Sequence, residues 1–233
     1  DDTVDPGLLT HAVSVAAQQQ PDMLIFGMSF DYYYRGKIYR REKLTPPCEE
    51  MLTPEQLKER FEELYNCNAL TTACNKLYRR ELVVSSGVRF HEDMILMEDF
   101  LFVLELLPFC RSIYSLPEAI YRYRQAEDDR RLQRIDDLSE YMRPFEKSME
   151  TLGIGSAEAE KTYKMLFLQK NYYEPISKIR KELHRHYKSR YAHLDVGIDA
   201  FSIYLCNKKI QLRHKIAVRI KAFLAGKKQG TEK

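Results

Sequence analysis

Apolar residues recur at helical spacing near the start of the chain, and strand-like runs follow them. The helical pattern begins at Asp5-Pro6, a capping residue followed by a first-turn proline, which predicts an amphipathic helix. The apolar run 23–28 has the length of a strand. Residues 30–39 alternate aromatic and polar side chains around Arg35-Gly36-Lys37, which predicts a hairpin that ends at Thr45-Pro46-Pro47.

Helical and strand patterns continue to residue 124. Thr53 and Pro54 form a helix start, and we expect one helix that carries Leu57, Phe61 and Leu64 on one face. The remaining predicted elements are helices over 80–85 and 98–107, and two short strands, 112–114 and 119–123, flanking Leu116-Pro117-Glu118.

Beyond residue 124 the pattern is helical and highly charged. Residues 128–152 and 158–191 have helical periodicity with almost no strand signal, and Gly153-Ile154-Gly155-Ser156 separates them. The sequence therefore predicts a mixed α/β part over 1–125 and an all-helical extension over 126–233.

Composition narrows the class of protein. Of the 233 residues, 44% are hydrophobic and 30% charged, as is ordinary for a soluble globular protein. The five cysteines are odd in number and have no CxxC spacing, which favours reduced thiols over a disulfide framework or a zinc site. No apolar run approaches the roughly 20 residues of a membrane-spanning helix, and no signal-peptide pattern opens the chain. We therefore expect a cytoplasmic protein.

Positive charge gathers near the end of the chain. Residues 207–228 contain eight Lys or Arg and no acid, although the whole chain carries a net charge of only +3. Apolar residues such as Ile216 and Phe223 alternate with these cations, a composition typical of a helix at an anionic membrane surface. A helix packed on its neighbours with solvated cations is the alternative. Nucleic acid is not expected as a partner, because the segment lacks interleaved aromatic residues that stack on bases.

Four short segments follow one another in a fixed order between residues 73 and 124. They are ACNKLYRREL at 73–82, GVRF at 87–90, MEDFLF at 97–102 and PEAIYRYR at 117–124. Their order and spacing resemble the second half of bacterial family 2 glycosyltransferases, which have the GT-A fold. The opening Asp1-Asp2-Thr3-Val4-Asp5-Pro6 resembles the end of the D-S-D-D stretch of that family.

The resemblance covers residues 1–124 and implies a partial GT-A α/β unit that lacks its nucleotide-binding half. The implied activity is inverting, metal-assisted transfer of a sugar from a nucleotide-sugar donor to a glycan or lipid-linked acceptor, in bacterial polysaccharide or envelope synthesis. We expect this chain to be inactive alone. A non-catalytic scaffold that retains the half-fold, and a peripheral membrane adaptor acting through 207–228, remain alternatives.

The resemblance implies that Asp99 is the catalytic base, with Glu98 beside it. A carboxylate can take the proton of an acceptor hydroxyl within hydrogen-bond reach. Asp99 lies at the start of a predicted apolar helix, where the helix dipole favours the ionised form by about 0.3–1 kcal/mol. Neighbouring helix positions diverge, so Glu98 should point elsewhere. Helix capping by the two acids is the simpler alternative.

The remaining site residues also come from the resemblance. The resemblance makes Asp1 the second Asp of the D-x-D metal motif, with Asp2 as a further candidate ligand, and Mg²⁺ or Mn²⁺ bound there would assist departure of the diphosphate. Solvated charge at the start of the chain is the alternative for these two acids. Asn75 and Lys76 would line the substrate cleft. Arg122 and Arg124 alternate with two tyrosines on a strand and so share a face, where they could contact the diphosphate. A surface ion pair is the alternative for these arginines.

Overall fold

The computed structural model describes residues 2–34, 37–125 and 131–155, with the single positions 162, 166, 177, 208, 212 and 216 beyond them. The chain forms two compact units, and the first, residues 1–131 and 143–159, contains the sheet. Nearly all of the predicted helix over 158–191 and of the basic segment 207–228 lies outside the described residues.

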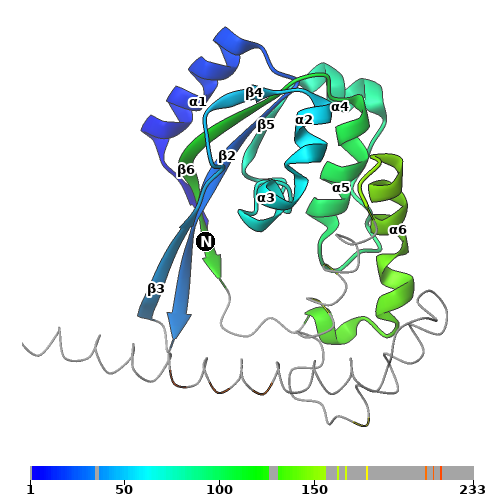
Figure 1. Ribbon diagram of the computed structural model, residues 1–233. Helices are drawn as coiled ribbons and strands as arrows, with labels where there is room; N and C mark the ends of the chain where they lie inside the picture. Colours follow the sequence, from blue (N-terminus) through cyan, green and yellow to red (C-terminus); the bar gives the residue numbers. More distant parts are fainter. Residues whose placement is uncertain are drawn as a thin grey trace, which may run out of the picture. The chain divides into compact units, whose positions relative to one another are not determined.

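A six-stranded mixed sheet forms the centre of the first unit (Figure 1). Its main path is β1-β6-β2-β3, in which β2 and β6 run parallel and the other pairs are antiparallel. The shorter strands β4 and β5 pair with β6 and β2. The strands are β1 (Thr3–Val4), β2 (Met23–Tyr34), β3 (Lys37–Leu44), β4 (Glu50–Leu52), β5 (Lys76–Tyr78) and β6 (Ile113–Gln125). The predicted α/β class and the hairpin are confirmed.

Helix α1 (Pro6–Gln19) covers one face of the sheet (Figure 1). It begins where the sequence predicts, because the Asp5 carboxylate accepts a hydrogen bond from the Leu8 N–H and Pro6 occupies the first turn. Its buried residues Ala12 and Val15 pack with apolar side chains of β2 and β6, among them Ile120.

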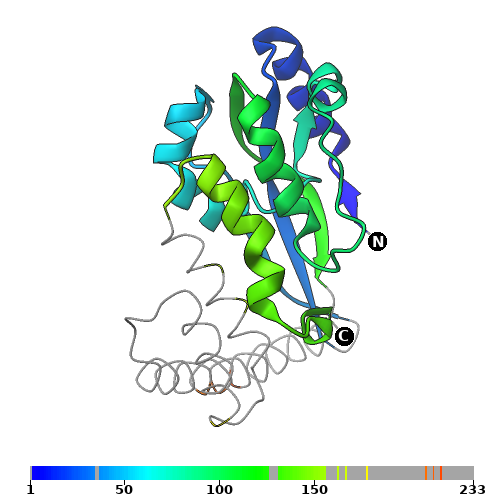
Figure 2. The same ribbon diagram turned by 90° about the vertical axis from the view of Figure 1, so that its right-hand side faces the viewer.

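The other helices lie on the opposite side of the sheet from α1 (Figures 1 and 2). The expected single helix after Thr53 is instead divided at Arg60, whose side chain forms ion pairs with Glu50 and Glu63. The capping box of Thr53 with Gln56 starts the first piece. These helices are α2 (Pro54–Glu59), α3 (Phe61–Asn66), α4 (Arg80–Ser86), α5 (Glu98–Leu106) and α6 (Leu138–Thr151).

The prediction of two short strands around Pro117 is wrong, because β6 runs unbroken from Ile113 to Gln125. Between the pairs Leu116↔Phe26 and Ala119↔Gly27, β6 contains two extra residues, so Pro117 lies in an exposed bulge. A proline has no N–H to donate, and a bulge is a place where a strand needs none.

Buried apolar residues form a core between α5 and the sheet, and α6 adds to this core. In α5, six of nine side chains are buried. The Phe100 ring, with no exposed surface, stacks on Phe145 of α6 at a centroid distance of 5.8 Å. The helix predicted from residue 128 is described from Leu138, after a 3-10 turn at Arg131–Arg134. No helix among the described residues is long and apolar enough to span a bilayer.

Candidate active site

Asp99 lies in the first turn of α5, on the side of the sheet away from α1. Met97, the residue before this helix, has a left-handed backbone with φ of 60° and offers no side-chain cap. This conformation is uncommon for a residue other than glycine and costs about 1–2 kcal/mol. A strained residue two positions before a proposed base is consistent with a backbone held for function.

The Asp99 carboxylate binds the loop before β5. Its Oδ2 accepts a hydrogen bond of 3.0 Å from the Ala73 N–H, while the Ala73 carbonyl accepts one of 3.2 Å from the Tyr78 hydroxyl. Among the described residues, none donates to Asp99 Oδ1. One oxygen therefore fixes the carboxylate, and the other is left to accept a proton. Glu98 lies in the same first turn, and its role stays a prediction.

Asn75 is buried, with 1% of its surface exposed, and all its amide hydrogen-bonding capacity is used. Its Nδ2 donates to the carbonyls of Phe26 and Asn68 at 3.0 and 3.2 Å. Its Oδ1 accepts from the Thr72 hydroxyl at 2.8 Å and from Lys76 Nζ at 2.6 Å. These bonds hold the loop around Asn75, and the substrate contact that the resemblance implies stays a prediction.

Lys76 is also buried rather than placed in an open cleft, with 6% of its surface exposed. Its Nζ donates to the Thr72 carbonyl as well as to Asn75. Burial lowers the pKa of Lys76 to about 7, although the nearby charge of Asp99 favours the ammonium form. Lys76 therefore holds the loop through Thr72 and Asn75, and its contact with a substrate stays a prediction.

Asp2 is held by residues of β6. Asp2 Oδ2 accepts a hydrogen bond of 2.9 Å from the Tyr121 hydroxyl, and Asp2 Oδ1 accepts one of 2.9 Å from the Arg124 N–H. Burial and the hydrogen bond to Asp2 raise the pKa of Tyr121. The structure thus fixes Asp2 against a strand that lies far from it in the sequence.

A metal site is not completed by the described residues. Among them, no three His, Cys, Asp or Glu side chains lie close enough together to hold an ion. Both oxygens of Asp2 accept one hydrogen bond each, and a cation bound there would need further ligands. The other predicted ligand, Asp1, lies outside the described residues.

Arg122 and Arg124 share one face of β6, because they pair with Ser29 and Asp31 of β2 with no register shift between them. Tyr121, which lies between Ile120 and Arg122, packs against the α1 cluster. The guanidinium of Arg124 stacks over the Tyr33 ring at 4.5 Å. A contact of these arginines with a diphosphate stays a prediction.

Strand pairing places two further basic residues, Arg41 and Lys43 of β3, near Arg122 and Arg124, and the sequence did not predict this. Ser29 of β2 pairs with both Arg122 and Lys43, and Asp31 pairs with both Arg124 and Arg41. The alternation of basic and other residues in β3 was a signal of one-sided charge, but only the register places these residues beside β6.

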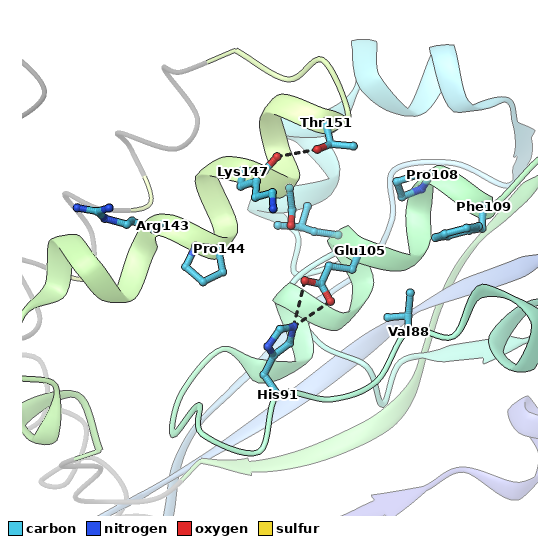
Figure 3. Close-up of a pocket in the computed structure, with 11 residues that line it drawn as sticks. Val88, His91, Glu105, Pro108, Phe109, Arg143, Pro144, Lys147 and Thr151 are labelled. Carbon is cyan, nitrogen blue, oxygen red and sulfur yellow. Dashed lines mark hydrogen bonds and ion pairs between the residues drawn. The ribbon is translucent and has the colours of Figure 1, made fainter.

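A separate cavity of about 650 Å³ lies between α5, α6 and the loop after α4 (Figure 3). His91 Nε2 lies 3.0 Å from both carboxylate oxygens of Glu105 on one wall, and Arg143 extends away from this pair. Pro108, Phe109 and other mainly apolar residues form much of the remaining cavity wall. His91, given no role from the sequence, thus joins the loop to α5.

Comparison with known proteins bears on the class of activity. No family model matches the chain. A curated relative is the Bacillus subtilis (strain 168) protein named "Uncharacterized glycosyltransferase EpsJ", which is 27% identical over 127 residues, or 54% of this chain and 36% of the relative. The chain is similar to a glycosyltransferase. The predicted resemblance is therefore confirmed, and the chain spans about a third of that relative's length.

Solved structures with some likeness include crystal structures of S. aureus TarS 1–349. The form in complex with UDP-GlcNAc has a TM-score of 0.44 and 17% identity, over 81% of this chain and 47% of the other. TarS 1–349 without a named ligand has a TM-score of 0.46 and 15% identity, over 89% of this chain and 53% of the other. Likeness at this level adds nothing to the assignment of a site.

Proposed function

We propose that this chain is the acceptor-side part of an inverting GT-A glycosyltransferase of family 2, with Asp99 as the catalytic base. The donor is a nucleotide sugar, and the acceptor is a hydroxyl of a glycan or lipid-linked glycan. The sequence resemblance and the relationship to a glycosyltransferase support this proposal. The proposed activity is that of a complete glycosyltransferase, since this chain spans only 36% of the relative's length.

The observation that carries the proposal is the arrangement of the Asp99 carboxylate. Oδ2 is fixed by the Ala73 N–H, and within the described part of the chain no group donates to Oδ1. Such a carboxylate is held in place yet retains an oxygen for general-base catalysis. A carboxylate that served only as a helix cap would instead bind N–H groups of its own helix, and Asp99 binds a loop 26 residues earlier.

The proposed step moves one proton and exchanges two bonds. Oδ1 of Asp99 takes the proton of the acceptor hydroxyl as that oxygen forms a bond to the anomeric carbon. The bond between the anomeric carbon and the diphosphate oxygen breaks, and the electron pair leaves with the nucleoside diphosphate. Attack opposite the leaving group inverts the configuration. Ala73, Asn75 and Lys76 orient the base and do not exchange protons with the substrates.

Further parts of the proposal concern the whole protein. Mg²⁺ or Mn²⁺ would require ligands beyond Asp2, and when bound it would stabilise the charge of the leaving diphosphate. We place the protein in the cytoplasm, at the inner face of the plasma membrane, with residues 207–228 attracted to anionic lipid. The product would be a bacterial polysaccharide or envelope glycan.

The test is Asp99→Asn in the complete polypeptide that contains this chain. Asparagine keeps an oxygen that can accept the Ala73 N–H bond, so the loop should be retained while the base is lost. We expect kcat to fall by about 10²–10⁴ with nucleotide binding unchanged. Glu98→Gln, one position away on the same turn, is the matched control and should lower kcat far less.

A kcat for Asp99→Asn within a few-fold of the wild-type value would refute the proposed base. The alternative of a non-catalytic scaffold predicts no transfer or donor hydrolysis by either protein, whichever nucleotide sugar is supplied.

A further inference from the structure

Tyr78 of β5 contacts both of the segments that hold Asp99. Its hydroxyl donates to the Ala73 carbonyl at 3.2 Å, and the Ala73 N–H donates to Asp99 Oδ2 at 3.0 Å. The Tyr78 ring meets Phe102 of α5 edge-on, with the ring centroids 5.9 Å apart and an angle of 76° between the planes. Phe102 lies about one helical turn after Asp99. Tyr78, Ala73 and α5 therefore form a closed set of contacts around the proposed base.

The two hydrogen bonds at Ala73 involve neighbouring peptide groups. The N–H that binds Asp99 belongs to the peptide between Thr72 and Ala73, whereas the carbonyl that binds Tyr78 belongs to the peptide that leads to Cys74. Each peptide group is planar, so the two can turn relative to each other only about the backbone torsions of Ala73. Fixing the carbonyl therefore restricts the direction in which the N–H points.

The core holds Tyr78 itself in place. Its backbone lies opposite Met23 in the pairing of β5 with β2, and Met23 has no exposed surface. The Phe102 ring is 5% exposed, and the Phe90 ring stacks on it at a centroid distance of 4.3 Å. Side chains packed in this way lose contacts if they move. Tyr78 thus relates the loop at Ala73 to a fixed position in the sheet and α5.

The Tyr78 hydroxyl remains a hydrogen-bond donor at neutral pH. Burial and the negative charge of Asp99 both raise the pKa of Tyr78. A neutral phenol donates one hydrogen bond, and the Ala73 carbonyl receives it. Because this hydrogen is committed to the loop, an effect of the hydroxyl on a reaction at Asp99 must act through Ala73.

We propose that Tyr78 is a positioning residue for the base, which sets the direction of the Ala73 N–H and through it the orientation of the Asp99 carboxylate. This inference rests on the proposed function, in which Asp99 Oδ1 takes the proton of the acceptor hydroxyl. A carboxylate that can rotate presents that oxygen in the reactive direction for only part of the time. Loss of the Tyr78 hydroxyl should therefore slow the chemical step and leave donor binding unchanged.

The first test is Tyr78→Phe in the complete polypeptide that contains this chain. Phenylalanine keeps the ring against Phe102 and removes only the hydroxyl. We expect kcat to fall by about tenfold, with the KM for the nucleotide sugar unchanged. Tyr114→Phe is the matched control, because it removes a hydroxyl that donates to Glu49 at 2.9 Å from a ring in the α1 cluster. It should lose one hydrogen bond yet keep its kcat.

A double-variant cycle separates positioning of the base from a general defect of the fold. If Tyr78 acts through Asp99, its hydroxyl has no effect on turnover once the base is gone. The kcat of Tyr78→Phe/Asp99→Asn should then lie within about twofold of that of Asp99→Asn. A general defect would instead multiply the losses of the two single variants.

Amide hydrogen exchange tests the same contact without any substrate. Exchange of the Ala73 N–H, followed by NMR in the complete polypeptide, should be about fivefold faster in Tyr78→Phe than in wild type. Tyr114→Phe should leave this rate unchanged.

Three results would each overturn the proposal. They are a kcat for Tyr78→Phe no lower than that for Tyr114→Phe, a multiplied loss in the double variant, and an unchanged exchange rate at Ala73. The proposed base fails on a separate result, a kcat for Asp99→Asn near that of wild type, so the two failures are distinguishable.

Discussion

Lys76 makes the stability of this fold depend on pH in a way that one substitution can isolate. Burial lowers its pKa from 10.5 to about 7 in the folded chain, whereas the unfolded chain should titrate at the ordinary value. Between these two pH values the unfolded state binds more protons than the folded state. The free energy of unfolding therefore rises with pH across this window, and the cost of burying the ammonium is greatest below pH 7.

The size of the effect follows from the two pKa values. The shift from 10.5 to about 7 corresponds to about 5 kcal/mol over the whole window, of which about 2 kcal/mol falls between pH 7 and pH 9. Lys76→Met keeps the apolar stem and removes the titrating group. The variant should lack this rise, although loss of the hydrogen bonds to Thr72 and Asn75 costs it about 1–3 kcal/mol at every pH.

The assay is urea unfolding of wild type and Lys76→Met at intervals from pH 6 to pH 9, with reductant present. The quantity of interest is the difference between the two free energies of unfolding, because other groups titrate alike in both proteins. Lys58→Met, at an exposed lysine of α2, is the matched control and should run parallel to wild type. Parallel curves for wild type and Lys76→Met would refute the claim that burial depresses the pKa of this lysine.

Two packing predictions can be checked by the same unfolding assay at one pH. Gly27→Ala should lose about 1–3 kcal/mol, because a Cβ at residue 27 would lie 2.5 Å from Thr45 Cγ2 and 2.8 Å from the Leu44 carbonyl. Gly7→Ala should be neutral or slightly stabilising, since its added Cβ meets nothing closer than 3.5 Å and alanine favours a helix. Phe100→Ala should lose about 3–5 kcal/mol because its ring has no exposed surface, and an equal loss from Phe109→Ala, at a ring 49% exposed, would contradict that reasoning.

The loop from Thr72 to Lys76 connects the proposed base Asp99 with the buried Lys76. Its backbone is held by Asp99 and Tyr78 at Ala73 and by Lys76 at Thr72, and the Thr72 hydroxyl donates a hydrogen bond to Asn75. Asn75 and Lys76, which the resemblance assigns to substrate contact, thus hold the loop that binds Asp99. Substitution of Asn75 or Lys76 should therefore change the placement of Asp99 along with stability.

Signals that act over a few residues were sufficient to predict much of the fold. Asp5 and Thr53 stand three residues before the N–H groups that they bind, and their helices begin where the capping pattern predicts. The hairpin after Phe30 and the helix that begins at Glu98 depend on equally local patterns. The sequence by itself also determined the order of the four motifs, and with it the similarity to glycosyltransferases that the curated relative confirms.

Only the tertiary structure decided which of the polar residues are buried and which meet. Asn75 and Lys76 look like surface residues in sequence, and their burial follows from the pairing of β5 with β2, more than 50 residues earlier. Arg41 and Arg122 share a sheet face because the register of β3, β2 and β6 places them there. Register and burial depend on contacts between distant segments. The local pattern of apolar and polar residues does not specify these contacts.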